Sequence, residues 1–154
     1  MATNFLWGTR QSATTLLTTE LNSLASGSGS SASSAIDFTS SGYWQLGDLE
    51  LYIASSSLAF TSSSYVDVYF VTSADGTNYP KYTSGASWKL ALGNYHAASI
   101  AIHPATLSSE AIYEVCREVR IPSAKFKVVL VNNTGVTLPA SSNTLKLYPT
   151  PEQY

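Results

Sequence analysis

Cysteine, histidine and charge are all scarce in this chain, and each scarcity argues against a class of function. The single cysteine, Cys116, has no partner for an intrachain disulfide, so nothing favours oxidative secretion. Its alternating surroundings predict a buried small side chain rather than a reactive thiol. Charged residues make up 12% of the chain and the net charge is -2, which argues against nucleic-acid binding, because that function needs clustered Lys and Arg.

Long hydrophobic runs are also missing. No apolar run approaches the ~20 residues of a membrane span. The first residues, Met1–Phe5, show no basic region followed by an apolar one, so we expect no signal peptide. The sequence therefore predicts a soluble protein that binds no membrane.

The residues that could carry catalysis stand in unsuitable settings. His96 and His103 flank one short predicted strand, and we expect both to be exposed loop-boundary residues. Serine is abundant, but no serine lies in a G-x-S-x-G nucleophile elbow. Asp48, Glu50 and Asp67 could form an acidic patch, yet they alternate with apolar residues as the solvated face of a sheet does. We expect no enzyme, no metal site and no cofactor.

What the chain does have is a series of short alternating runs. Trp44–Ala54, Tyr65–Thr72 and Phe126–Val131 are the clearest, and turn-forming Ser, Asn, Gly and Pro separate them. Shorter runs lie at 36–38, 87–92, 97–103, 111–121 and 145–148. About eight strands at roughly ten-residue spacing predict an all-β fold. We expect a single antiparallel β-sandwich, with a jelly roll as one candidate topology.

The first 34 residues differ, and we expect them to form a unit apart from a sandwich domain at 35–154. Residues 1–12 are expected to form an arm. Leucines at helical spacing in Ala13–Ala25 predict one short helix, although its threonines are poor helix formers. Ser26–Ser34, SGSGSSASS, has the composition of a flexible linker. Six apolar residues of this unit are the candidate partner-binding residues: Phe5, Leu6, Trp7, Leu17, Leu21 and Leu24.

Several segments resemble small β-rich virion proteins of tailed bacteriophages. Residues 67–79, DVYFVTSADGTNY, are similar to a strand-to-loop pattern of that group, and residues 16–26, LLTTELNSLAS, to its N-terminal portion. The ending of the group resembles three segments here: IPSAKF at 121–126, VNNTGV at 131–136 and NTLKLYP at 143–149. The resemblance covers most of the chain and consists of strand-and-turn patterns.

The resemblance implies a non-enzymatic decoration or cement protein on the capsid surface, made in the host bacterial cytoplasm. Its expected partners are the major capsid protein and copies of itself, in a homo-oligomer. The family offers no catalytic residues. Because buried aromatic residues dominate interface energetics, we expect the arm and the following helix to clasp a neighbouring subunit or the major capsid protein.

Two alternatives stay open at this point. Carbohydrate-binding sandwiches present aromatic platforms. Trp7, Trp44, Trp88 and the ten tyrosines could supply one, with Tyr79 and Tyr82 flanking the loop at 75–80. This predicts a glycan- or receptor-binding module on a tail or head fibre. The other alternative is a component of the tail or of the head–tail junction.

Overall fold

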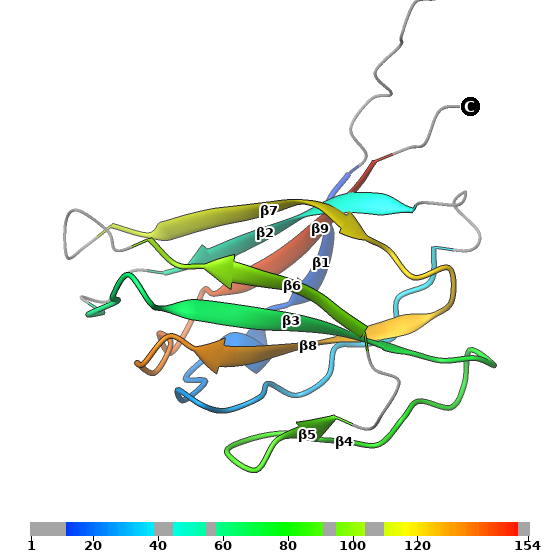
Figure 1. Cartoon of the computed structure of the whole chain (residues 1–154), viewed down its shortest axis with the longest axis horizontal. Coiled ribbons are helices and arrows are strands. Elements are labelled where there is room, and N and C mark those ends of the chain that lie inside the picture. The colour runs from blue at the N-terminus through cyan, green and yellow to red at the C-terminus, as the bar shows by residue number, and fades with distance from the viewer. Residues whose placement is uncertain (1–11, 39–44, 55–57, 91–94, 104–109, 151–154) are drawn as a thin grey trace, which may run out of the picture.

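The structure is a computed structural model that describes residues 12–38, 45–54, 58–90, 95–103 and 110–150. Two antiparallel sheets face each other across one hydrophobic core, which confirms the all-β sandwich (Figure 1). The strand order is β1-β9-β2-β7 in the first sheet and β6-β3-β8 in the second. The elements are β1 (Thr14–Leu17), the 3-10 turn η1 (Thr19–Leu21), β2 (Leu46–Ile53), β3 (Tyr65–Thr72), β4 (Tyr82–Thr83), β5 (Lys89–Leu90), β6 (Tyr95–Ala101), β7 (Ile112–Arg120), β8 (Phe126–Asn133) and β9 (Thr144–Thr150).

Alternating side chains on the central strands build the core. Every second residue of β2, β3 and β8 points inward, as the period of a strand requires. These inward residues have no exposed surface: Leu49, Leu51, Ile53, Val66, Val68, Phe70, Phe126, Val128 and Leu130. The rings of Phe70 and Phe126 meet at the centre, with 4.8 Å between their centroids.

The helix expected over Ala13–Ala25 is wrong. Thr14–Leu17 forms β1, which pairs with β9, and only Thr19–Leu21 makes a turn of 3-10 helix. Threonine is β-branched and prefers an extended backbone, and the edge of β9 supplies the hydrogen-bond partners that this backbone needs. Among the described residues there is no α-helix, so none there could span a membrane.

Residues 26–34, expected to be a flexible linker, instead run along the side of β8 that does not face β3. Antiparallel bridges join Gly29 to Val131 and Ile36 to Phe126. This segment lies beside β8 as a fourth member of the second sheet. The described part of residues 1–34 therefore belongs to the sandwich and is not a separate unit.

Serine hydroxyl groups complete this pairing. The amide of Ser30 donates to the carbonyl of Leu130, and the amide of Ser33 donates to that of Val128. In return the β8 amides donate to hydroxyl oxygens, with 3.1 Å from Leu130 N to Ser30 Oγ and 2.8 Å from Val128 N to Ser33 Oγ. The segment advances three residues while β8 advances two, so a hydroxyl takes the place of the backbone carbonyl.

The path between the sheets is that of a jelly roll. From β1 the chain crosses to the segment beside β8, returns to β2 and crosses again to β3 and β6. It then alternates between the sheets through β7, β8 and β9. The first and last of these strands, β1 and β9, are neighbours in one sheet.

The β4–β5 hairpin lies outside the second sheet, beyond β8 in Figure 1. Gly85 in its turn bridges to Gly29, and the Tyr82 hydroxyl donates to the Ser30 carbonyl. A Cβ atom on Gly29 would lie 2.9 Å from Trp88 Cβ, so the close approach of the hairpin requires glycine there. The same packing partly buries the Tyr82 ring and raises the pKa of its hydroxyl to about 12.

Candidate binding sites

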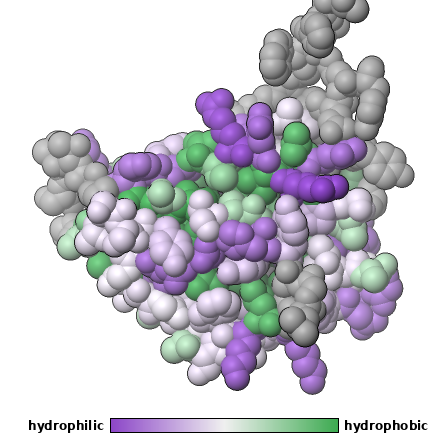
Figure 2. Space-filling model, viewed as in Figure 1, coloured by the Kyte–Doolittle hydropathy of each residue, from purple (hydrophilic) through white to green (hydrophobic). Residues whose placement is uncertain are grey.

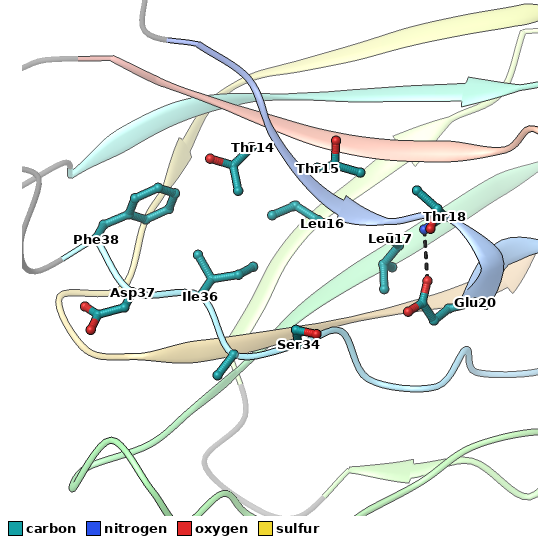
Figure 3. A pocket seen from close by; sticks show the side chains of 11 residues that line it. Thr14, Thr15, Leu16, Leu17, Thr18, Glu20, Ser34, Ile36, Asp37 and Phe38 are labelled. Carbon is teal, nitrogen blue, oxygen red and sulfur yellow. Dashed lines mark hydrogen bonds between the residues drawn. The ribbon is translucent and has the colours of Figure 1, made fainter.

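A groove of about 590 Å³ lies between β1 and residues 34–38, at one edge of the sandwich (Figure 3). β1 is an edge strand of the first sheet, and the segment beside β8 forms the corresponding edge of the second. The apolar walls are Leu16 and Leu17 on one side and Ile36 and Phe38 on the other. Figure 3 shows these side chains extending into the space between the two segments.

Acidic side chains stand at the two ends of this groove. Glu20 Oε2 accepts the Thr18 amide at 2.9 Å. At the other end Asp37 Oδ2 lies 3.3 Å from Lys125 Nζ. No basic side chain is among the described residues that line the groove. The charge of Asp37 is therefore balanced by Lys125, and hydroxyl groups of threonine and serine line much of the groove between the two ends.

The six expected partner-binding residues fall into two groups, of which the structure describes one. Leu17, Leu21 and Leu24 are buried in the core of the sandwich, so they are not available as a surface that clasps a partner; Leu17 alone also reaches the groove wall. The spacing of these leucines correctly predicted that they are buried. It predicted the wrong secondary structure, because they lie in or after a strand and a 3-10 turn rather than on an α-helix. Phe5, Leu6 and Trp7 lie outside the described residues.

A polar cluster that the sequence did not reveal lies on the outer face of the second sheet. We call Asp67, His96, Ser99 and Asn133 the Asp67 cluster. Asp67 Oδ1 accepts the Ser99 hydroxyl and lies 3.2 Å from His96 Nε2, while Oδ2 accepts Asn133 Nδ2 at 2.9 Å. His96 is exposed as expected, but it belongs to β6 rather than to a loop boundary.

The Asp67 cluster contains the residue types of a catalytic triad without its geometry. A triad needs the carboxylate on one imidazole nitrogen and the hydroxyl on the other. Here the same His96 Nε2 lies 3.2 Å from Asp67 Oδ1 and 3.2 Å from Ser99 Oγ. Ser99 also donates directly to the carboxylate. This arrangement does not set up a proton relay that would activate the hydroxyl.

Aromatic rings border the Asp67 cluster. The Tyr69 and His96 rings meet edge to face at 5.1 Å, and Trp88 of the hairpin lies 6.1 Å from Tyr69. Burial and the neighbouring Asp67 carboxylate raise the pKa of the Tyr69 hydroxyl. Tyr65, two residues before Asp67 on β3, is 41% exposed. Fixed polar groups beside aromatic rings are the components with which proteins bind polyhydroxylated ligands.

The outer face of the first sheet has a different character. We call Tyr52, Tyr113, Val115, Lys146 and Tyr148 around Glu50 the Glu50 face. Tyr113 and Val115 are 58% and 45% exposed, and the rings of Tyr52 and Tyr113 lie edge to face at 5.8 Å. The acidic patch that the alternating pattern argued against does not bring all three carboxylates together, because Glu50 and Asp67 lie on different sheets.

Glu50 is held in its charged form at the centre of this face. Burial by itself would raise the pKa of this carboxyl group. Hydrogen bonds from Tyr113 and Tyr148, together with the Lys146 ammonium group, outweigh burial and lower the pKa below its ordinary value. Lys146 Nζ lies 3.5 Å from Glu50 Oε1. The charge of this carboxylate is thus balanced within the chain.

The remaining candidates form no site. His103 Nδ1 lies 2.9 Å from Glu114 Oε1 on the surface. Burial raises the pKa of the Cys116 thiol, which makes the reactive thiolate scarcer. Within the part of the chain that the structure describes, no group of His, Cys, Asp and Glu could hold a metal ion. Comparison with family models, with curated proteins and with solved structures finds no match.

Proposed function

We propose that this protein is a non-enzymatic structural component of a tailed-phage virion that binds the major capsid protein and stabilises the capsid shell. The observation that carries the proposal is the Glu50 face. It combines exposed Tyr113 and Val115 with a carboxylate that is already neutralised inside the chain. Tyrosine-rich, weakly charged surfaces are typical of protein interfaces, and covering this one leaves no unpaired charge at Glu50.

The surface as a whole supports the same role. On the face seen in Figure 2, pale and weakly polar residues lie between scattered strongly hydrophilic ones. With a net charge of -2, copies packed closely on a shell repel each other little. The resemblance of the strand-and-turn segments to phage virion proteins points in the same direction.

The test uses virions assembled without the protein, to which purified protein is added. We expect binding in a fixed ratio to the major capsid protein, measured on a stained gel, and greater resistance of the particles to heat. The double variant Tyr113→Ser with Val115→Ser should lose this binding, because it removes the exposed apolar surface. Tyr65→Ser, on the outer face of the other sheet, is the matched control and should bind normally.

Two results would overturn the proposal. One is unchanged capsid binding by the Tyr113 and Val115 variant. The other is a copy number that does not follow that of the major capsid protein. A small number set by one symmetric ring would instead indicate the tail or the head–tail junction.

The Asp67 cluster favours a second candidate, a glycan-binding module of a phage fibre. Its hydrogen-bonding groups are held in place by one another, and Tyr65 beside them is exposed. This candidate predicts glycan binding on an array, lost in Tyr65→Ala and retained in Tyr113→Ala. Absence of binding by the wild-type protein contradicts it.

A further inference from the structure

The outer edge of β7 offers backbone groups for pairing. β7 lies at one end of the first sheet, and among the described residues it pairs with β2 alone (Figure 1). It spans nine residues, against four for β1 and seven for β6, which also end their sheets. An edge strand can pair with another extended segment, and proline or lysine in the strand commonly prevents this. β7 contains neither.

The direction of the backbone groups follows from β2, which β7 contacts. The Ala54 amide donates to Asn143 Oδ1 at 3.2 Å, beside the start of β9. Because backbone groups alternate in direction along a strand, Leu49, Leu51 and Ile53 direct theirs toward β7. Their partners there are residues 116, 114 and 112. Residues 113 and 115 therefore direct their amide and carbonyl groups away from β2, toward the free edge.

A bulge limits the regular part of this edge. The pairing of β2 with β7 shifts so that Arg117 and Glu118 both lie opposite the position of Asp48, and Glu118 has a φ of 57°. A bulge bends and twists its strand, which ends regular pairing on the outer side as well. The stretch that a partner strand can follow is therefore 113–117, and Val115 is its midpoint.

This stretch is complementary to a second copy of itself. In an antiparallel pair centred on Val115, each Tyr113 lies opposite Arg117 of the second copy, where the guanidinium group can contact the ring. A two-fold axis repeats this contact. Glu114 then lies opposite Cys116. Registers centred on Glu114 or on Cys116 instead place Glu114 opposite another glutamate, and like charges directly opposite each other are destabilising.

We propose that two copies pair through β7 in the antiparallel register centred on Val115. This pairing joins two four-stranded sheets into one continuous sheet. The side chains of Tyr113 and Val115 stay on the outer surface, so the two Glu50 faces form a single surface with Val115 at its centre. A partner that binds this surface contacts residues of both copies.

This inference concerns the purified protein and does not rest on capsid binding, so either can fail while the other holds. The measurement is molar mass by sedimentation over a range of concentrations, and we expect the wild type to pass from monomer to dimer as concentration rises. Val115→Pro should stay monomeric, because proline lacks the amide hydrogen that points to the free edge. Ala35→Pro is the matched control, since it lies on the opposite edge of the sandwich, beside the Ile36 amide that pairs with β8.

A charge series tests the register without changing the backbone. Tyr113→Lys places an ammonium group opposite Arg117 of the second copy, and it should weaken the dimer about tenfold because the contact occurs twice. Adding Arg117→Glu should restore most of the affinity, since opposite charges then meet. Tyr113→Lys with Arg120→Glu has the same net charge, but Arg120 lies beyond the bulge. This control should remain weak.

Three results would overturn the proposal. One is a wild-type chain that stays monomeric at its highest soluble concentration, which would leave this edge to another segment of the chain or to a different protein. Another is a dimer still formed by Val115→Pro, with its strand content checked by far-UV circular dichroism. The third is equal restoration by Arg117→Glu and Arg120→Glu, and this result remains decisive if the proline variant does not fold.

Discussion

Asn132, near the end of β8, has no exposed surface, and its side-chain amide joins three parts of the chain. Its Nδ2 donates to the carbonyls of Leu24 and Val136, at 2.8 and 2.9 Å. Its Oδ1 accepts the amide of Thr134 at 3.0 Å and the hydroxyl of the same residue at 2.6 Å. Every hydrogen-bonding capacity of the amide is therefore used.

Replacing Asn132 by alanine should lower the free energy of unfolding by about 2–4 kcal/mol, because buried carbonyl and amide groups lose their partners. The side chain of the neighbouring Asn133 donates to Asp67 and is only partly buried. Asn133→Ala is therefore the matched control, with an expected loss of at most about 1 kcal/mol. Chemical denaturation of both variants measures the difference, and equal losses would contradict this account.

Glu50 makes stability depend on acidity. Its pKa is lowered in the folded protein, so the folded state favours the charged form and gains stability above the ordinary pKa of the group. That gain disappears as the pH falls through the lowered pKa. Glu50→Gln should therefore be less stable than wild type at neutral pH. The difference between their free energies of unfolding should become smaller as the solution is acidified below about pH 4.5.

Denaturation curves at a series of pH values check this expectation. Tyr113→Phe with Tyr148→Phe should reduce the same pH dependence, since it removes the hydroxyl donors that favour the charged form. Tyr65→Phe, on the other sheet, serves as the control and should leave the dependence unchanged. If wild type and Glu50→Gln differ by the same free energy of unfolding at all pH values, the Glu50 carboxylate is not the source of the pH dependence.

The serine-rich segment beside β8 is the element whose structure differs most from the one that its sequence predicts. Ser30→Ala with Ser33→Ala removes the hydroxyl acceptors of two buried β8 amides. We expect a loss of about 1–3 kcal/mol for each position. Ser31→Ala with Ser34→Ala makes the same chemical change at exposed positions and should cost little. Thermal unfolding of the two double variants compares them, and similar melting temperatures would count against hydroxyl pairing.

Local alternation was sufficient to predict the main strands. Tyr65–Thr72 is β3 with the expected ends, and Phe126, Val128 and Leu130 form the inward face of β8. These assignments succeed because burial on one face leaves a two-residue period in the sequence. The segment 26–34 leaves no such period, since its hydrogen bonds come from a distant strand and repeat every three residues.

The candidate sites were hard to predict for a related reason. His96 and Ser99 reach Asp67 only through the register of β3 with β6, which shifts between Val68 and Tyr69. No short-range pattern specifies such a shift. The groove likewise joins β1 to residues 34–38, which were assigned to different units from the sequence. Both sites are products of tertiary pairing rather than of motifs.

At the scale of the whole molecule, β9 is the strand on which the first sheet depends, because it lies between β1 and β2. Removing residues 144–154 should abolish cooperative folding, since β1 and β2 then lose their shared partner and Leu145 and Leu147 leave the core. Circular dichroism during heating is the measurement. The control removes only residues 151–154 and should melt like the full chain. A cooperative transition in the longer truncation would contradict this dependence.

The pairing of β1 with β9 joins residues that are far apart in the sequence, with Thr14 opposite Leu147. During translation the chain emerges from its N-terminal end at about 5–20 residues per second. Residues 14–17 therefore have no β9 to pair with for several seconds, while the intervening strands are synthesised. A chain released early lacks β9 and leaves the edges of β1 and β2 unpaired, and such edges can pair with other chains. The first sheet can therefore form completely only after the chain has been synthesised through Thr150, the last residue of β9.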